Sequence, residues 1–249
     1  SLTSIHEGAF WDCPNVTHLD ISGPSVIGTE MYATGSQVLK EVVIRGTVDT
    51  VGYGAFDSQA GYYNPEEYYS KDRNGYHFTT TDARLVIEEG VKTIGNYAFR
   101  NCDIFTEIQL ADSITSVGNY SFEGCDRITT ADIPASLEAL GEGAFYNCDG
   151  LTELVIPGTL KKIGAKAFSD CDAITKLVLS EGVNVLEKEA FRYCDGITEL
   201  RTPASLTAIR EGAFWDCPNV THLDIGGPSV IGTEMYATNS QVLKEMVIR

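Results

Sequence analysis

The amino-acid sequence predicts a β-rich solenoid of about ten coils, in which each coil packs only on its two neighbours. Two periods indicate this fold. Ser1–Arg45 returns almost unchanged as Ser205–Arg249, at an offset of 204 residues. Inside that long period a residue pair recurs every 23 residues, and a fixed period of about 20 to 50 residues is typical of stacked repeat proteins. The pair comprises Phe99, Phe122, Phe145, Phe168, Phe191 and Phe214, with Cys102, Cys125, Cys148, Cys171, Cys194 and Cys217.

One unit, residues 151–174, shows how a coil is built. Leu154 and the isoleucine two places on alternate with other residues, which predicts a short strand with one face turned inward. Pro157 ends this strand, because proline cannot donate to a sheet ladder. A second extended segment follows, and then Phe168 enters the core. Asp172 turns the chain toward the next coil, and we expect its carboxylate to bond its own backbone.

Stacking the units predicts columns of identical side chains. We expect Phe145 and Phe168 to be fully buried and in contact. The seven cysteines share one column and are odd in number, and no C-x-x-C pair exists to hold zinc. We therefore expect free thiols that act as small hydrophobic side chains. A threonine column beside the inward leucines is expected to favour the strand and to solvate the sheet edge.

The unit resembles the repeat of the BspA-like, or Treponema pallidum type, leucine-rich repeat family, in which A-F-x-x-C follows L-x-I-P and I-G. The resemblance implies a right-handed leucine-rich solenoid on a cell surface, usually bacterial or protozoan, with binding or adhesion roles and without catalytic residues. It covers almost the whole chain apart from residues 60–82. The best-matching units are Thr106–Ile128, Thr129–Leu151, Thr152–Ile174, Thr175–Ile197 and Thr198–Val220.

The period breaks in two places. Near Thr34 to Gln37 the spacing slips and recovers, which predicts a local bulge. Residues 60–82 form an insertion of about 20 residues, and its Asn74-Gly75 pair predicts a hairpin. Two interpretations stay open: the insertion is a binding loop, or it is tolerated and only covers the flank of the solenoid. Its tyrosines are Tyr62, Tyr63, Tyr68, Tyr69 and Tyr76.

Composition narrows the function classes. The net charge is −17, which disfavours nucleic acid and anionic membranes as partners. No apolar run approaches the roughly 18 residues that span a bilayer. We interpret residues 1–249 as one solenoid domain and as a segment of a longer array of 204-residue units. Neighbouring units of the same chain are therefore possible partners, and the expected location is extracellular.

Catalytic chemistry is not expected. The four histidines form no nucleophile grouping, and one of them, His6, is Arg210 in the other copy. No phosphate loop follows a strand, and no cofactor or metal is expected. The stretch from Ser70 resembles half of a calcium loop but lacks the first Asp and the last Glu. A looser cation site formed by Glu66, Glu67, Asp72 and Asp82 stays open.

A mixed-charge column follows the threonines on the predicted outer face of the strands. Glu153, Lys176 and Glu199 are its candidate binding residues, together with the tyrosines of the insertion. The leading hypothesis is a non-enzymatic surface module that binds a protein or a glycan. The alternative is a structural rod, since the near-identity of the two copies is typical of a uniform repeat array.

Overall fold

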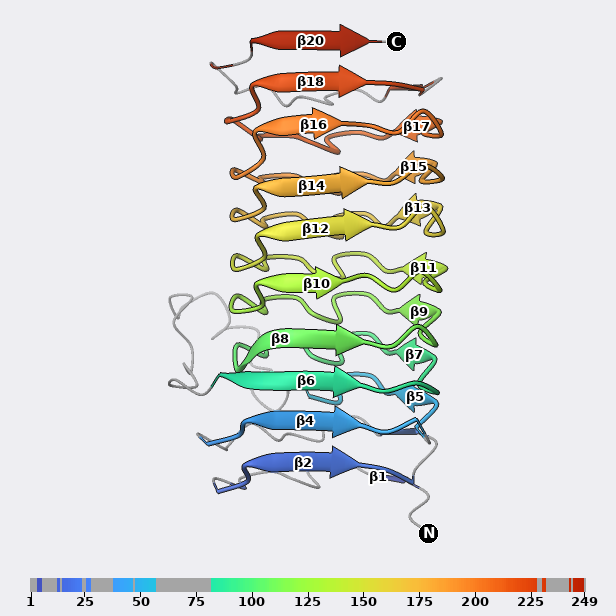
Figure 1. Ribbon diagram of the computed structural model, residues 1–249, viewed down its shortest axis with the longest axis vertical. Coiled ribbons are helices and arrows are strands. Elements are labelled where there is room, and N and C mark those ends of the chain that lie inside the picture. Colours follow the sequence, from blue (N-terminus) through green and yellow to red (C-terminus); the bar gives the residue numbers. More distant parts are fainter. Residues whose placement is uncertain are drawn as a thin grey trace, which may run out of the picture.

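The computed structural model is a stack of parallel coils that runs along one long axis (Figure 1). Each coil contributes one longer strand to one side of the stack and one two-residue strand to another. This confirms the predicted solenoid. In the described part of the chain, no helix is long and apolar enough to cross a membrane. The structure describes residues 4–5, 13, 15–23, 26–27, 38–46, 48–56, 82–227, 230–231, 242 and 244–248.

The longer strands stack in chain order and pair in parallel. Partners in the regular coils are 23 residues apart, as for Glu153 and Lys176. These strands are β2 His18–Ile21, β4 Glu41–Ile44, β6 Ala83–Ile87, β8 Phe105–Leu110, β10 Thr130–Asp132, β12 Glu153–Ile156, β14 Lys176–Leu179, β16 Glu199–Arg201, β18 His222–Ile225 and β20 Glu245–Ile248. Strands β2 to β14 form one sheet, and β16, β18 and β20 form another.

The two-residue strands form two further parallel sheets, β1 to β11 and β13 to β19. From β3 onward, each follows the turn that ends the longer strand of its coil. They are β1 Ser4–Ile5, β3 Val26–Ile27, β5 Thr50–Val51, β7 Thr93–Ile94, β9 Ser116–Val117, β11 Ala139–Leu140, β13 Lys162–Ile163, β15 Val185–Leu186, β17 Ala208–Ile209 and β19 Val230–Ile231.

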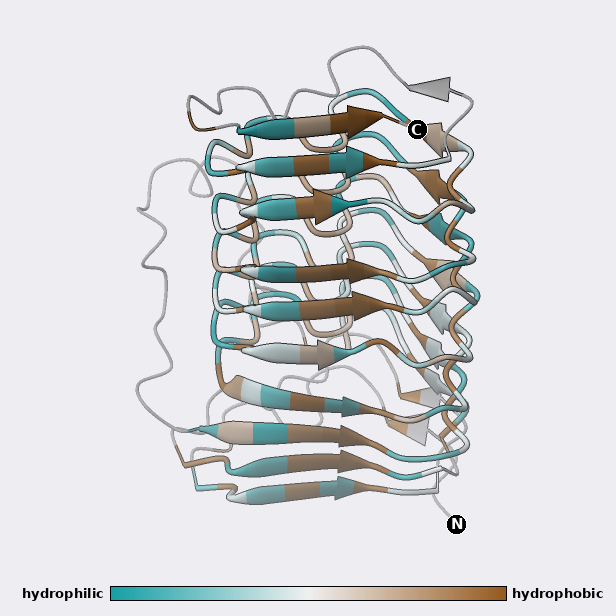
Figure 2. Cartoon of the chain, turned by 45° about the horizontal axis from the view of Figure 1, so that its top comes forward, coloured by the Kyte–Doolittle hydropathy of each residue, from teal (hydrophilic) through white to brown (hydrophobic). Residues whose placement is uncertain are grey.

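Buried and exposed residues alternate along the longer strands, and the buried residues form the core. In β12 the exposed residues Glu153 and Val155 alternate with Leu154 and Ile156, which are fully buried. Figure 2 shows that most of the longer strands carry both hydrophilic and hydrophobic residues. Because side chains in a strand point to opposite faces in turn, one face packs into the stack and the other faces solvent.

The phenylalanine column lies in the interior of the stack. Phe145 and Phe168 are fully buried, and their ring centroids lie 5.4 Å apart at an interplanar angle of 6°. This confirms the predicted contact. Parallel stacking continues through neighbouring coils, for example from Phe99 to Phe122 at 5.2 Å. Such aromatic pairs add stabilisation beyond their buried area.

Backbone hydrogen bonds also connect the turns around each phenylalanine. The N–H of Phe145 donates to the carbonyl of Ala167 in the next coil, at 2.8 Å. Residues two places before or after a column phenylalanine take left-handed φ angles, such as Lys166 at 54° and Asp170 at 58°. Their N–H groups donate to the next coil as well, which offsets the strain of that conformation. Glycine replaces them where the repeat allows, as at Gly143.

The cysteines are free in all seven positions, and six of them are buried. The Sγ of Cys171 donates to the carbonyl oxygen of Phe145 at 3.1 Å, and Cys194 repeats this contact with Phe168 at 3.1 Å. Burial raises the pKa of the Cys217 thiol to about 12. The thiols therefore act as hydrogen-bond donors between coils, a role beyond the small hydrophobic side chain that we expected.

Polar side chains in the turns and strands also connect successive coils. The hydroxyl of Thr152 donates to the carbonyl of Thr129 at 3.2 Å, and Thr221 repeats this with Thr198 at 3.1 Å. Besides lying at the sheet edge, each of these hydroxyls thus bonds the preceding coil, a contact that the sequence analysis did not predict. An aspartate follows the cysteine in five successive coils, and we call Asp103, Asp126, Asp149, Asp172 and Asp195 the aspartate column. In it, the carboxylate of Asp103 accepts the backbone N–H of Asp126, one coil ahead, at 3.1 Å.

The insertion leaves the strand ladder continuous. Strands β4 and β6 pair directly although their partners Glu41 and Arg84 are 43 residues apart in sequence. A register shift between β6 and β8 lies at Ala83/Arg84, where the chain returns from the insertion. The five candidate tyrosines, the predicted hairpin and the predicted bulge at residues 34–37 lie outside the described residues.

Candidate binding surface on the strand face

The outward side chains of the longer strands form one continuous surface, which we call the strand face. In β12, β14 and β16 its first outward residues are Glu153, Lys176 and Glu199, and all three are exposed. The second outward positions of the same strands are Val155, Val178 and Arg201. The interior packing holds these positions at sheet spacing, so adjacent coils present their side chains next to one another.

Only two of the three predicted charged residues are joined by an ion pair in the structure. The Nζ of Lys176 lies 2.9 Å from the Oε2 of Glu153, and the two side chains are 58% and 56% exposed. Glu199 instead lies 3.8 Å from Arg201 of its own strand. Exposed pairs of this kind contribute little to stability, so their charges are available to a partner at little cost to the fold.

Two valines at the centre of this surface were not predicted as site residues. Val155 and Val178 are register partners, and they are 49% and 40% exposed. Beside them lies a depression of about 290 Å³ between β10 and β12, whose lining includes Asp132 and Pro157. We call Val155 and Val178, with Glu153, Lys176 and Asp132, the valine patch. Valine at an outward position in two successive repeats is the sequence signal that could have identified it.

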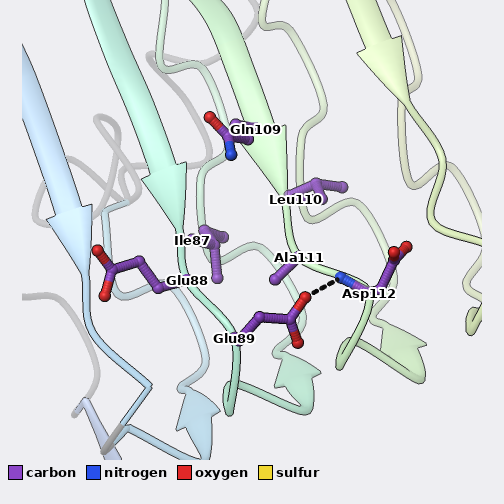
Figure 3. Close-up of a pocket in the computed structure, with 7 residues that line it drawn as sticks. All are labelled: Ile87, Glu88, Glu89, Gln109, Leu110, Ala111 and Asp112. Carbon is purple, nitrogen blue, oxygen red and sulfur yellow. Dashed lines mark hydrogen bonds between the residues drawn. The ribbon is translucent and has the colours of Figure 1, made fainter.

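A second depression, of about 460 Å³, lies where β6 and β8 end (Figure 3). Its carboxylates already hold the stack together. The Oε1 of Glu89 accepts the N–H of Asp112 at 3.0 Å, and Glu88 pairs with Arg45 at 2.5 Å. Among the described residues, no group of three His, Cys, Asp or Glu side chains is placed to hold a metal ion. This depression therefore offers hydrogen-bond acceptors rather than a cation cage.

A short aromatic ladder lies on the turn side of the coils. Tyr97 and Tyr120 stack with centroids 5.6 Å apart, and Tyr53 meets Tyr97 edge-on at 5.4 Å. The guanidinium of Arg100 lies 4.7 Å from the centre of the Tyr97 ring. Tyr53 is 54% exposed, and it lies three residues before Phe56, the last described residue before the insertion. This ladder is a second apolar surface that the sequence reasoning did not identify.

Two equivalent histidines, one in each copy of the 45-residue segment, contact residues of the threonine column. The Nδ1 atom of His222 lies 2.8 Å from the hydroxyl of Thr221, and His18 lies 3.0 Å from Thr17 in the same way. Both imidazoles are therefore in hydrogen-bond contact with a neighbouring side chain of the ladder.

Comparison with known proteins bears on the fold. The family model described as the BspA type leucine rich repeat region matches residues 1–61, 74–196 and 161–248, in six copies. No curated protein sequence matches the chain. A leucine-rich repeat protein from T. pallidum is similar in structure, with 22% identity and a TM-score of 0.51 over 77% of this chain and 72% of the other.

A leucine-rich repeat protein from Eubacterium ventriosum gives a TM-score of 0.55 at 19% identity, over 92% of this chain and 78% of the other. At these identities the two structures show the fold alone. The charged residues and valines of the strand face therefore have to be interpreted from their own geometry.

Proposed function

The chain belongs to the family of BspA-type leucine-rich repeat proteins, and on that basis we propose that it is a non-enzymatic binding or adhesion module displayed at a cell surface. The family resemblance supports the surface location. The rigid stack supports the binding role. Its interior side chains specify the fold, so the outward side chains can contact a ligand without a cost to the fold.

The valine patch carries this proposal. Two neighbouring valines are exposed on β12 and β14, the last two strands of the seven-stranded sheet, together with the carboxylates of Glu153 and Asp132 and the ammonium of Lys176. Apolar side chains surrounded by charges of both signs have the composition of a protein–protein contact, in which the apolar centre excludes water and the charged rim sets orientation. A protein ligand is therefore the partner that we propose.

The tyrosine-rich insertion supplies the second proposed contact. Tyrosine gives a large contact area at a low entropy cost, and loops on rigid scaffolds commonly carry recognition. We include Tyr62, Tyr63, Tyr68, Tyr69 and Tyr76 in this contact, and Glu199 in the rim of the valine patch.

An array of purified extracellular-matrix proteins and glycans tests the proposal. We expect the intact protein to bind one or more protein spots, and we expect the double variant Val155→Lys/Val178→Lys to lose that signal at least tenfold. Val86→Lys, at the matching outward position of β6, is the control and should bind as the parent does. Deletion of residues 60–81 separates the contribution of the insertion from that of the patch.

Three outcomes would contradict the proposal. The first is no binding above that of an unrelated solenoid. The second is equal loss with Val86→Lys, which would indicate a general charge effect. The third is binding to glycan spots alone that survives the double variant, which would move the site to the aromatic ladder around Tyr97.

A structural rod is the second candidate function, and one observation favours it. Residues 1–45 and 205–249 differ at only five positions, and binding sites that act independently would be free to diverge further. A rod and a binding module are compatible, because a stiff stack can present the strand face along its length.

A further inference from the structure

The chain carries a net charge of −17, yet cations gather beside three successive short strands, β13, β15 and β17 (Figure 1). Lys162 of β13 is the register partner of Val185 in β15, which in turn is the partner of Ala208 in β17. The group therefore spans two strand spacings, about 10 Å. We call it the basic cluster, and its members are Lys162, Lys166, Lys188, Arg192 and Arg210.

Three carboxylates hold the cluster in place. Glu187 pairs with the first and last of the five cations, at 2.9 and 3.1 Å. Glu189 lies 3.4 to 3.9 Å from the other three, and Glu211 lies 2.9 Å from Lys188. Five cations against these three carboxylates leave a surplus of two positive charges.

The cations lie outside the two carboxylates that they share. The side chains of Glu187 and Glu189 are 18% and 10% exposed, whereas those of Lys162 and Lys166 are 62% and 40% exposed. The Nζ of Lys166 also lies 3.9 Å from Glu189, which is too far for a hydrogen bond. Since an ammonium carries three N–H donors, this layer can donate to an anion that approaches from solvent.

The packing of the repeat does not call for charges at this position. Four preceding coils have glycine where Glu187 and Arg210 stand: Gly95, Gly118, Gly141 and Gly164. A Cβ at Gly164 would lie 2.5 Å from the carbonyl oxygen of Gly141, so glycine suits the close approach of these coils. The sequence departs from glycine in two successive coils, and both departures add a charge to the same ion-pair group.

An exposed aromatic ring borders the basic cluster. Trp215 is 36% exposed, and the central guanidinium carbon of Arg192 lies 4.6 Å from the centre of its ring. This cation–π contact holds an apolar ring next to positive charges. Sugar rings pack their C–H faces on aromatic rings, so the combination fits a saccharide that carries negative charge. An acidic peptide would use the cations and leave the ring without a role.

We propose that the basic cluster and Trp215 form a binding site for a short sulfated saccharide, separate from the valine patch. Ammonium groups of the cluster contact the sulfate esters, and one sugar ring packs on Trp215. Lysine is a point charge without the planar fork by which arginine selects carboxylates, so a lysine-rich cluster suits tetrahedral sulfate groups. Charges beyond about 8 Å are screened at physiological ionic strength, so the acidic remainder of the chain opposes only a ligand that reaches past the cluster.

Calorimetric titration of the intact protein with sulfated maltotetraose tests the proposal, with unsulfated maltotetraose as the neutral probe. We expect only the sulfated sugar to bind. Lys162→Gln/Lys166→Gln should weaken that binding at least tenfold while the fold is kept, because Glu187 and Glu189 retain their other cations. Lys40→Gln/Lys92→Gln changes the net charge equally at two exposed lysines elsewhere, and it should bind as the parent does. Trp215→Leu should weaken binding about fivefold or more.

A second readout does not depend on how the variants fold. The chain has two tryptophans, Trp11 and Trp215, so Trp11→Phe leaves Trp215 as the single fluorophore, whose emission should change on titration with the sulfated sugar. Absence of binding, or equal loss in the Lys40/Lys92 control, would overturn the proposal. Equally tight binding of tetragalacturonate would refute the preference for sulfate, and equally tight binding of tetraglutamate that survives Trp215→Leu would make an acidic peptide the occupant. None of these substitutions lies in the valine patch, so the protein spots of the array report on that patch separately.

Discussion

The interior of the stack and its strand face are built from the same coils. The interior residues stay the same from coil to coil, whereas the outward residues change. At the core position every coil from Phe99 to Phe214 keeps phenylalanine, and the rings stack at 5.0 to 5.5 Å. On the strand face, one outward column changes charge and size from coil to coil: Glu107, Thr130, Glu153, Lys176, Glu199, His222. The difference indicates that the repeat keeps the residues by which coils pack on one another and lets the outward residues vary, as the proposed binding role requires.

The largest test of this comparison is Phe168→Ala in the interior. We expect a loss of about 3–5 kcal/mol of unfolding free energy, because the ring is fully buried between Phe145 and Phe191 and its removal leaves a cavity. Chemical denaturation measures the loss, and hydrogen exchange should show it spreading to the adjacent coils. Phe168→Leu is the control and should cost clearly less.

A melting temperature within a degree or two of the parent would show that the column does not hold the coils together. The interior and the strand face would then contribute alike to stability, and the division of roles between them would fail.

The features of the interior that follow from the 23-residue period alone could be predicted from the sequence. Spacing of 23 residues was enough to stack Phe145 on Phe168 and to bury the thiols of Cys171 and Cys194. It was not enough to find the hydrogen bond from the Thr152 hydroxyl to Thr129. That contact depends on where the backbone of the neighbouring coil presents its carbonyl oxygen, which no single repeat specifies.

The candidate site was predicted less completely than the fold, for a related reason. The charged column of the sequence identified Glu153 and Lys176 as candidate binding residues, and in the structure the two side chains form an ion pair. The exposure of Val155 and Val178 depends on which face of β12 and β14 is outward and on what the neighbouring strands leave uncovered. The repeat pattern places both valines in the outward column of the mixed-charge face, but charge alone selected the candidate binding residues of that face, so the valines were not among them.

The next prediction concerns the aspartate column, which lies where the interior meets the surface. Desolvation, with the neighbouring charges of Asp103 and Asp149, raises the pKa of Asp126 to about 7. A carboxyl whose pKa is raised in the folded state disfavours folding once it ionises. Stability should therefore fall as the pH rises from about 4 through 7. The residue is exposed, so solvent screening limits the effect to less than about 1 kcal/mol.

Asp126→Asn isolates this contribution, because the amide oxygen can still accept the hydrogen bond that Asn147 Nδ2 now donates to Asp126 Oδ1 at 3.1 Å. Denaturation midpoints between pH 4 and pH 8 should flatten in the variant, which should match or exceed the parent in stability at pH 8. A parent that becomes more stable across this range, with a variant that does not, would reverse the sign and contradict the prediction.

The smallest expected effect is on the strand face itself. A double-mutant cycle with Glu153→Gln and Lys176→Gln should give a coupling of about 0.5 kcal/mol, since both side chains are more than half exposed. The coupling should disappear in about 1 M salt, where charges a few ångströms apart are screened. A coupling above about 2 kcal/mol that persists in salt would mean that this pair stabilises the stack as the core does. The outward charges would then be constrained by the fold, and Glu153 and Lys176 would no longer be free to serve a ligand.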